Sequence, residues 1–439
     1  MSPFGSSSPG RRRLLGAFVL VAAVATAAAA RLGEPDPTQT ALRSQLSGLQ
    51  TAEAYLWEAY AARDFKPMWT AFEAGGVIAL LDRADEEGLP RRPVEAGKLR
   101  EALLRAANSP SDRAHFEIEM SRALATYESD LRRPASETRL FVTDPLMAPP
   151  ERRKVLMAAA LAPDLAQHLA AARGMHPIYE SFRAARQRLA RLPQTAARRR
   201  LDRLLLANMD RARILPVHGR YIVVDAAAAR LWLYEGTKPV ATMKAVVGEP
   251  DQPTPVMAGL IRYIVFNPYW NIPPDLVRDK IAPKVLERGL KVLADDRLEV
   301  LADWSPSART LDPSTVDWGA AVDGKQILRV RQRPGAGNMM GRVKFMFPNR
   351  LGVYLHDTSD HSVFDRAERH LSAGCVRVED AAALSLWMGR PLPGRGAGED
   401  FRADLPKPIP VYLSYFTVQV DGGDASPRPD PYGRDDPQR

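Results

Sequence analysis

Tyr221-Ile222-Val223-Val224-Asp225 and Arg230-Leu231-Trp232-Leu233-Tyr234 are two short runs of apolar and β-branched residues joined by alanines. Runs of this composition and length on either side of a turn are typical of neighbouring antiparallel strands. A third apolar run, residues 241–247, ends at Gly248, and Gly236 with Lys238-Pro239 provides the turn before it. Because such short turns leave no room for a helical crossover, the pattern predicts an antiparallel β-meander.

The β pattern continues towards the C-terminus, with further strands expected at residues 262–266, 328–331, 350–356 and 410–420. We therefore expect a mostly antiparallel β domain, a barrel or a sandwich, over residues 216–420. Between residues 271 and 340 the pattern weakens, with a short helix expected at 280–289 and many turn-forming residues around it. Long insertions of this kind are often functional, so a lid-like insertion is predicted; a structured excursion that only packs on the barrel is the alternative. Residues 421–439, rich in Asp, Gly, Pro and Arg, are expected to be a loosely ordered tail.

The first half of the chain has a different hydrophobic pattern, because apolar residues recur at helical spacing from about residue 34 to residue 215. One series at spacings of three and four comprises Phe116, Met120, Leu124, Tyr127 and Leu131. Prolines divide the region into short helices joined by loops. Residues 31–215 are thus predicted to form an all-helical scaffold domain, and the fold class of the whole chain is α+β.

The N-terminus has the pattern of a secretory signal peptide. Arg11-Arg12-Arg13 precede an apolar run from Leu14 to Ala30 that ends in alanines, so residues 1–30 are predicted to direct export. An uncleaved segment that anchors the protein to the inner membrane is the alternative, since the run is marginal in length for a membrane helix. We expect an exported, periplasmic protein, with the export route and the cleavage left open.

The charge of the chain is positive in both its full and its processed form. Removing residues 1–30 takes away three arginines and no acids, which lowers the formal charge from +9 to +6. A basic surface outside the cytoplasm suits an anionic polymer such as a cell wall, although a solvated, arginine-rich surface explains the charge equally well. Since the sequence has no recognisable nucleic-acid-binding motif, no nucleic acid partner is predicted.

Cys375 is the single cysteine of the chain, and it follows His356 by 19 positions. An isolated cysteine is often a small buried hydrophobe. Here the surrounding sequence favours thiol catalysis, because Gly374 lets backbone N–H groups approach a substrate carbonyl and a histidine is available as base. Arg377 would share a strand face with Cys375 and hold a carboxylate beside it. The pattern predicts a cysteine nucleophile that attacks a carbonyl.

These residues resemble the L,D-transpeptidases with a YkuD-type catalytic domain. The similarity includes His356 and the run Ser372-Ala373-Gly374-Cys375-Val376-Arg377, and it extends to Thr254-Pro255, Phe266–Trp270, Gly341–Phe345 and Pro348-Asn349. It covers about residues 216–420, and the helical half is similar to the scaffold domain of the large YcbB-like subgroup. Two features depart from the pattern: Ala373 stands where many members have a second histidine, and no separate peptidoglycan-binding module fits between Leu189 and Arg220.

The resemblance implies a mechanism and a substrate. His356 would deprotonate Cys375, and a backbone carbonyl near Asp357 or Thr358 would orient the imidazole, with the Asp357 carboxylate as the less favoured alternative. The thiolate would attack the bond before the terminal D-alanine of a peptidoglycan tetrapeptide stem, and backbone N–H groups of Gly374 and Cys375 would hold the oxyanion. A neighbouring amine would then form a 3→3 cross-link. Arg377 would bind a stem carboxylate or fix the active-site loop. Tyr354 would line the cleft, and Ser372 would form a hydrogen bond within the turn.

The resemblance leaves the acceptor open, since the same acyl-enzyme attaches proteins to peptidoglycan or, with water, acts as an L,D-carboxypeptidase. No cofactor is expected, carbapenems are expected to acylate Cys375, and other cell-wall synthesis proteins are candidate partners of the helical domain. His361 and His370 raise the alternative of a metal site with His356 and Cys375, but the spacing of these residues matches no compact ligand pattern. Three other functions are less consistent with the sequence. In sortase-like enzymes the catalytic His and Cys are farther apart in the chain, and in papain-like hydrolases the Cys precedes the His. A non-enzymatic wall-binding scaffold would require that Cys375 be dispensable.

Overall fold

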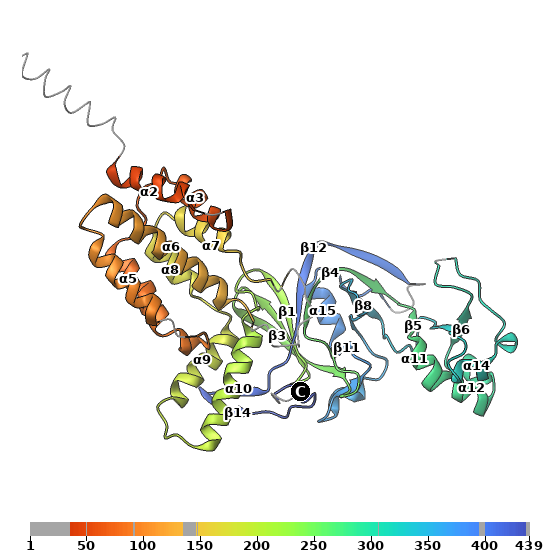
Figure 1. Ribbon diagram of the computed structural model, residues 1–439. Helices are drawn as coiled ribbons and strands as arrows, with labels where there is room; N and C mark the ends of the chain where they lie inside the picture. The colour runs from red at the N-terminus through yellow and green to blue at the C-terminus, as the bar shows by residue number, and fades with distance from the viewer. Residues whose placement is uncertain are drawn as a thin grey trace, which may run out of the picture. The chain divides into compact units, whose positions relative to one another are not determined.

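The structure, a computed structural model, describes residues 36–49, 51–90, 93–134, 146, 148–305, 307–394 and 400–435. The signal peptide predicted over residues 1–30 lies outside the described residues. Contacts divide the chain into a first unit, residues up to 84, 90–129 and 150–173, and a second unit, residues 85–89, 130–149 and everything from 174 onward. Figure 1 shows the helices of the first unit in red to yellow and the strands of the second in green to blue. Within the described residues no helix combines the length and the apolar character needed to span a membrane.

The first unit is helical, as the sequence predicts. Its helices are α2 (Pro37–Ser47), α3 (Ala54–Ala61), α4 (Ala71–Asp82), α5 (Pro93–Arg105), α6 (Pro110–Leu131), α7 (Arg152–Ala160) and α8 (Leu165–Ala172). The apolar series of α6 is buried along its whole length, from Phe116 to Leu131. Glu117, on the same helix, is fully buried and accepts hydrogen bonds from the Tyr60 hydroxyl at 2.8 Å and from Met68 N at 2.7 Å. This buried carboxylate connects α6 to α3 and to the segment that follows α3.

A nine-stranded sheet forms the core of the second unit. Its strands run in the order β10, β3, β11, β9, β8, β4, β12, β1, β2, and β2 also pairs with β3, so that the sheet closes into a barrel. The bounds are β1 (Arg220–Asp225), β2 (Arg230–Glu235), β3 (Lys238–Gly248), β4 (Met257–Phe266), β8 (Val343–Met346), β9 (Leu355–His356), β10 (His370–Ser372), β11 (Val376–Val378) and β12 (Phe401–Ser414). The predicted meander is β1, β2 and β3, paired antiparallel. Three pairs are parallel, namely β1 with β12, β9 with β11, and β3 with β10. The predicted fold class is confirmed.

Two predicted strands differ from the observed ones. The strand expected at 350–356 is reduced to Leu355–His356, because the Asn349 side chain accepts from Leu351 N and Val353 N and holds these residues in a turn. The run expected at 410–420 is divided between β12 and β13 (Val418–Asp421). The break between them corresponds to a change of partner, because Phe416 N donates to the buried carboxylate of Asp225 at 2.9 Å.

The insertion between residues 271 and 340 is more regular than the sequence suggests. A three-stranded sheet of β5 (Trp270–Ile272), β7 (Arg329–Gln332) and β6 (Leu298–Leu301) packs with α11 (Pro274–Leu276), the π-helical turn Val277–Ile281, α12 (Ala282–Arg288), α13 (Lys291–Asp295) and α14 (Trp318–Val322). These elements share a hydrophobic core that includes Val277, Val285, Trp318 and Val330. The short helix expected at 280–289 is present as α12. The strand expected at 328–331 is present as β7 (Arg329–Gln332). The other helices and strands of the insertion, three to five residues long, are too short to show a period and could not be predicted from it.

The C-terminal residues are ordered, which corrects the prediction of a loose tail over 421–439 for its described part. β13 pairs with β14 (Asp424–Pro427), and beyond β14 the Arg428 guanidinium contacts the buried Asp225 carboxylate at 3.2 Å. Polar residues that composition assigns to solvent thus have buried partners elsewhere in the fold.

The predicted domain boundary at residue 215 also differs from the contacts. Helices α9 (Pro177–Leu189) and α10 (Ala196–Ala212) belong to the second unit. Asn208 on α10 donates to the Thr417 hydroxyl at 3.0 Å, and the Phe182 ring on α9 lies 5.7 Å from the Phe416 ring. These contacts join the last two helices of the helical half to the β-rich unit.

Candidate active site

The register of β9 and β11 brings four of the predicted site residues to one face of the sheet. His356 pairs with Arg377 in the parallel ladder, and Val376 N donates to Tyr354 O at 3.2 Å, which extends the pairing to Tyr354 and Cys375. Since alternate residues of a strand share a face, the side chains at 354, 356, 375 and 377 lie together. The antiparallel pairing of β8 with β9 places Lys344 opposite His356 on this face as well. The intervening residues face the barrel interior.

The turn before Cys375 is held by side-chain hydroxyls. Gly374 has a φ of 99°, a left-handed conformation that favours glycine. The Ser372 hydroxyl donates to Cys375 O at 2.6 Å, and the Thr254 hydroxyl donates to Gly374 O at 2.9 Å. Ser372 therefore has the place within the turn that the sequence suggested. Thr254 was not predicted as a site residue, although Thr254-Pro255 belonged to the similar blocks.

His356 is oriented by a backbone carbonyl. Its imidazole is 2% exposed, and Nδ1 lies 2.6 Å from Asp357 O. Because a carbonyl only accepts hydrogen bonds, Nδ1 carries the proton and Nε2 has a free lone pair. Burial, with a further contribution from the Arg377 charge, lowers the pKa of His356 to about 3. The imidazole is therefore neutral at physiological pH and able to accept a proton at Nε2.

The Asp357 carboxylate has other partners. Its Oδ2 accepts from Arg342 N at 2.8 Å, and its Oδ1 lies 3.4 Å from His361 Nε2. Of the two alternatives for orienting the imidazole, the structure has the backbone carbonyl of Asp357 and not its carboxylate.

The surroundings of Cys375 have opposing effects on the pKa of its thiol. Burial raises the pKa of the thiol, while hydrogen bonds from the backbone and the hydroxyl of Tyr354 lower it, as do the charges of Lys344 and Arg377. The thiol sulfur lies 3.8 Å from Gly352 O, and the Tyr354 hydroxyl lies 3.4 Å from the thioether sulfur of Met340. The resting state is thus a neutral thiol beside a neutral imidazole, with a donor and two cations placed to stabilise a thiolate once it forms.

The two cations differ in their partners. Lys344 Nζ donates to Tyr269 O at 3.1 Å, and burial lowers the pKa of the ammonium. Burial lowers the pKa of Arg377 as well, and its Nε is buried without a hydrogen-bond partner in the described part of the chain. A buried guanidinium N–H with no partner is costly and is suited to an incoming acceptor such as a carboxylate. Lys344 was missed as a site residue because its proximity to Cys375 depends on strand pairing.

The other histidines of this region are not gathered into a metal site. His370 Nε2 contacts Ala226 O at 2.9 Å, and His361 is exposed beside Asp357. Among the described residues, no three His, Cys, Asp or Glu side chains are grouped as metal ligands would be.

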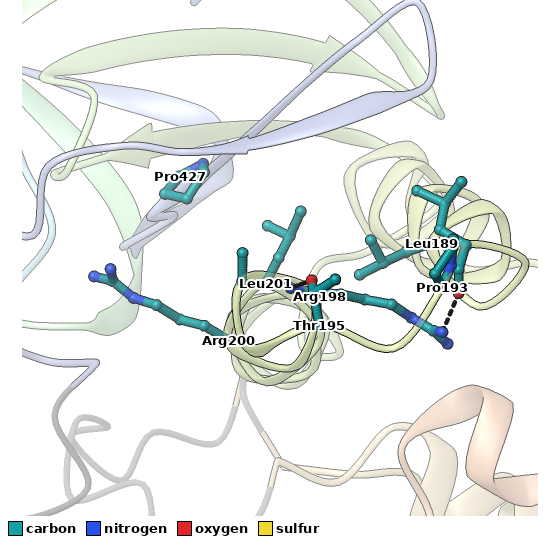
Figure 2. A pocket seen from close by; sticks show the side chains of 9 residues that line it. Leu189, Pro193, Thr195, Arg198, Arg200, Leu201 and Pro427 are labelled. Atoms are coloured by element: carbon teal, nitrogen blue, oxygen red, sulfur yellow. Dashed lines mark hydrogen bonds between the residues drawn. The ribbon is translucent and has the colours of Figure 1, made fainter.

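A cavity of about 530 Å³ lies elsewhere in the second unit. Figure 2 shows its lining, which comes from α9, α10 and the loop between them together with β14, and includes Leu189, Arg198, Leu201 and Pro427. None of the lining residues belongs to the strands or turn that carry Cys375 and His356, so this cavity is separate from the candidate site.

Two protein-family models match parts of the chain. Residues 219–393 match the L,D-transpeptidase catalytic domain, YkuD, and residues 54–185 match a scaffold domain. A putative L,D-transpeptidase of Haemophilus influenzae is 29% identical over 261 residues, which cover 57% of this chain and 52% of that protein. The match thus spans about half the length of the curated relative.

Solved structures with similarity include an L,D-transpeptidase from Mycobacterium smegmatis, at 13% identity and a TM-score of 0.23, covering 44% of this chain and 58% of that one. A mutant L,D-transpeptidase of Enterococcus faecium has 14% identity and a TM-score of 0.20, covering 50% of this chain and 64% of that one.

Proposed function

We propose that this chain, which joins a scaffold domain to an L,D-transpeptidase catalytic domain of the YkuD type, uses Cys375 as nucleophile to cross-link peptidoglycan stems. The observation that carries the proposal is the neutral His356 imidazole, whose protonated Nδ1 faces the Asp357 carbonyl while its ring shares a strand face with Cys375. This tautomer leaves Nε2 free to take the thiol proton.

In the first half-reaction the Cys375 sulfur attacks the carbonyl that joins the third stem residue to the terminal D-alanine. The thiol proton moves to His356 Nε2 as the carbon–sulfur bond forms. Backbone N–H groups of Gly374 and Cys375 hold the oxyanion, and each such donor is typically worth about 3–4 kcal/mol of transition-state stabilisation. The imidazolium then protonates the leaving amine, D-alanine departs, and a thioester remains on Cys375.

In the second half-reaction an amine of a neighbouring stem attacks the thioester. His356 accepts the amine proton and returns it to the sulfur, which restores the thiol and forms a 3→3 cross-link. Arg377, with its unpartnered buried Nε, binds a carboxylate of the stem, and the Tyr354 hydroxyl supports the thiolate. The substrate lies outside the cytoplasm, so the proposal includes export by the predicted signal peptide. Contacts of the helical half with other wall-synthesis proteins stay a prediction from the sequence.

Mass spectrometry of products from a purified disaccharide-tetrapeptide tests the proposal, with Cys375→Ala as control. A dimer that lacks one D-alanine, formed by the wild type alone, supports L,D-transpeptidation. If tripeptide were the only product, the assigned reaction would be hydrolysis, or transfer to a different acceptor, and not cross-linking. Products that persist in Cys375→Ala, or a wild type that neither reacts nor is acylated by a carbapenem, would overturn the assignment.

A further inference from the structure

The segment that follows β14, residues 428–435, lies against a loop that supports the catalytic turn; we refer to this segment as the C-terminal strap. Tyr432 makes the central contact. Its hydroxyl donates to Gly248 O at 2.8 Å and accepts from Thr254 N at 3.4 Å. Arg434 adds a hydrogen bond to Thr254 O at 3.2 Å. The strap thus contacts both ends of the loop 248–254.

The strap is anchored at both of its own ends. Arg428 contacts Asp225, whose side chain is 1% exposed, at 3.2 Å, and Asp435 contacts Arg211, which is 2% exposed, at 2.8 Å. Between these anchors the Tyr432 ring stacks on Tyr415, with ring centroids 5.1 Å apart. Each ion pair includes one almost fully buried charge, which would be costly to leave unpaired, so both ends of the strap are held in place around Tyr432.

Thr254 transmits this support to the catalytic turn. The residue is fully buried, and its hydroxyl accepts from Gly248 N at 2.9 Å while donating its single proton to Gly374 O at 2.9 Å. A side chain at Gly248 would collide with the loop, since a Cβ there would lie 2.1 Å from Gln252 O. The loop is therefore folded tightly around the Thr254 hydroxyl.

The hydrogen bond to Gly374 O determines where the next N–H points. The peptide group between Gly374 and Cys375 is planar, so its C=O and its N–H point in opposite directions. Gly374, with a φ of 99° and no side chain, has little conformational preference of its own to fix this plane. A hydrogen bond that holds the carbonyl on one side therefore aims the Cys375 N–H at the other side, where the oxyanion forms.

We propose that Thr254 and Tyr432 are positioning residues for the oxyanion: the strap holds Thr254 through Tyr432, and Thr254 holds the Gly374–Cys375 peptide with its N–H aimed at the reacting carbonyl oxygen. The inference rests on the proposed function, because it assigns a role within the same reaction. It extends the active site to residues 428–435, which follow Cys375 by more than 50 positions in the sequence.

Two reagents separate positioning from general damage. Iodoacetamide alkylates a thiolate by direct displacement and forms no oxyanion, whereas a carbapenem acylates the same sulfur through an oxyanion. The full-length protein and the variants Thr254→Val, Thr254→Ser and Tyr432→Phe are compared by the ratio of the two second-order rate constants, with thermal melting recorded for each. Tyr221→Phe is the matched control, since Tyr221 also donates a hydroxyl to a carbonyl, Gly236 O, at 2.7 Å in the same unit.

Thr254→Val is expected to lower the acylation-to-alkylation ratio by about 10- to 100-fold, somewhat less than complete removal of an oxyanion donor costs. Thr254→Ser, which keeps the hydroxyl, should restore the ratio, and Tyr432→Phe, which keeps the stacked ring, should lower it by about 3- to 10-fold, a loss near one uncharged hydrogen bond. Tyr221→Phe should leave the ratio unchanged.

Ratios equal to wild type in both Thr254→Val and Tyr432→Phe would overturn the inference while leaving the proposed function intact. If Thr254→Val does not fold, Tyr432→Phe decides alone. A wild type that is alkylated but never acylated would instead overturn the proposed function and, with it, the inference.

Discussion

Replacing Tyr354 by phenylalanine removes the hydroxyl that we propose supports the Cys375 thiolate. In the resting state this hydroxyl is 3.4 Å from the Met340 thioether, a weak acceptor, and burial raises its own pKa, so it stays protonated and available as a donor. When the thiol ionises, the charged sulfur becomes the much better acceptor. Tyr354→Phe therefore raises the pKa of Cys375, and the ring contact with His356, at 5.6 Å between centroids, is kept.

The magnitude follows from the strength of one hydrogen bond to a charged group. Such a bond contributes about 1.5–3 kcal/mol, from which a small amount is subtracted for the lost contact with the thioether. Because one pKa unit corresponds to about 1.4 kcal/mol, the thiol pKa should rise by roughly 1–2 units. At a pH below both pKa values the thiolate fraction, and with it the alkylation rate, should fall by about 10- to 100-fold.

The assay is the rate of iodoacetamide alkylation as a function of pH, followed by intact mass. Tyr354→Phe should move the midpoint upward and leave the plateau at high pH unchanged, whereas Tyr221→Phe should not move it. A midpoint identical to that of the wild type would refute the assignment of the hydroxyl to the thiolate. A lowered plateau would instead indicate a change in access to the sulfur.

Three further predictions concern ionisable groups of the second unit. Because the pKa of His356 is about 3, the imidazole is already neutral at pH 5. The rate of carbapenem acylation should therefore be lost only as the pH falls towards 3. A histidine-dependent rise in kcat/KM between pH 5 and 8 would contradict this. Arg377→Gln should raise the KM for the tetrapeptide stem by about 10- to 100-fold, the loss of one charge-assisted hydrogen bond, and an unchanged KM for D-alanine release would count against carboxylate binding. His176 is fully buried at the start of α9, and burial lowers its pKa to about 3. As the pH falls from about 6.5 towards 3, the unfolded chain therefore binds a proton that the folded chain does not. The free energy of unfolding should decrease over this pH range. His176→Asn keeps an acceptor for Ile178 N and should lose less stability than wild type between pH 7 and pH 4 in urea unfolding; equal losses would contradict the assignment.

The residues of the candidate site were predictable where a reactive side chain lies next to other site residues in the sequence. Cys375 is a single cysteine next to a glycine, and the alternation of a strand relates it to Arg377, so their shared face could be expected. Lys344 could not be found in this way, because a lysine in a short strand has the same local pattern whether it faces solvent or a thiol. Its place opposite His356 depends on the pairing of β8 with β9.

The C-terminal strap shows the same limit on a larger scale. Its composition, rich in Asp, Gly, Pro and Arg, is that of a flexible tail, and the prediction of a loose tail followed from composition alone. Arg428, Tyr432 and Asp435 are nevertheless ordered by Asp225, Gly248 and Arg211, each more than 180 residues away. Composition describes the average solvent preference of a residue and contains no information about a specific buried partner.

The sequence by itself determined the two halves of the protein, because the periods of apolar residues, near 3.6 before residue 215 and near 2 after it, are local properties of the chain. It also contains the residues of the proposed thiol chemistry, since Cys375, Gly374 and His356 have the functional groups that this chemistry requires. The tertiary structure alone decided the tautomer of His356, the cations beside the thiol, the independent core of the insertion and the support of the catalytic turn by Thr254 and Tyr432. These depend on burial and on hydrogen bonds between distant residues, which exist only after the chain has folded.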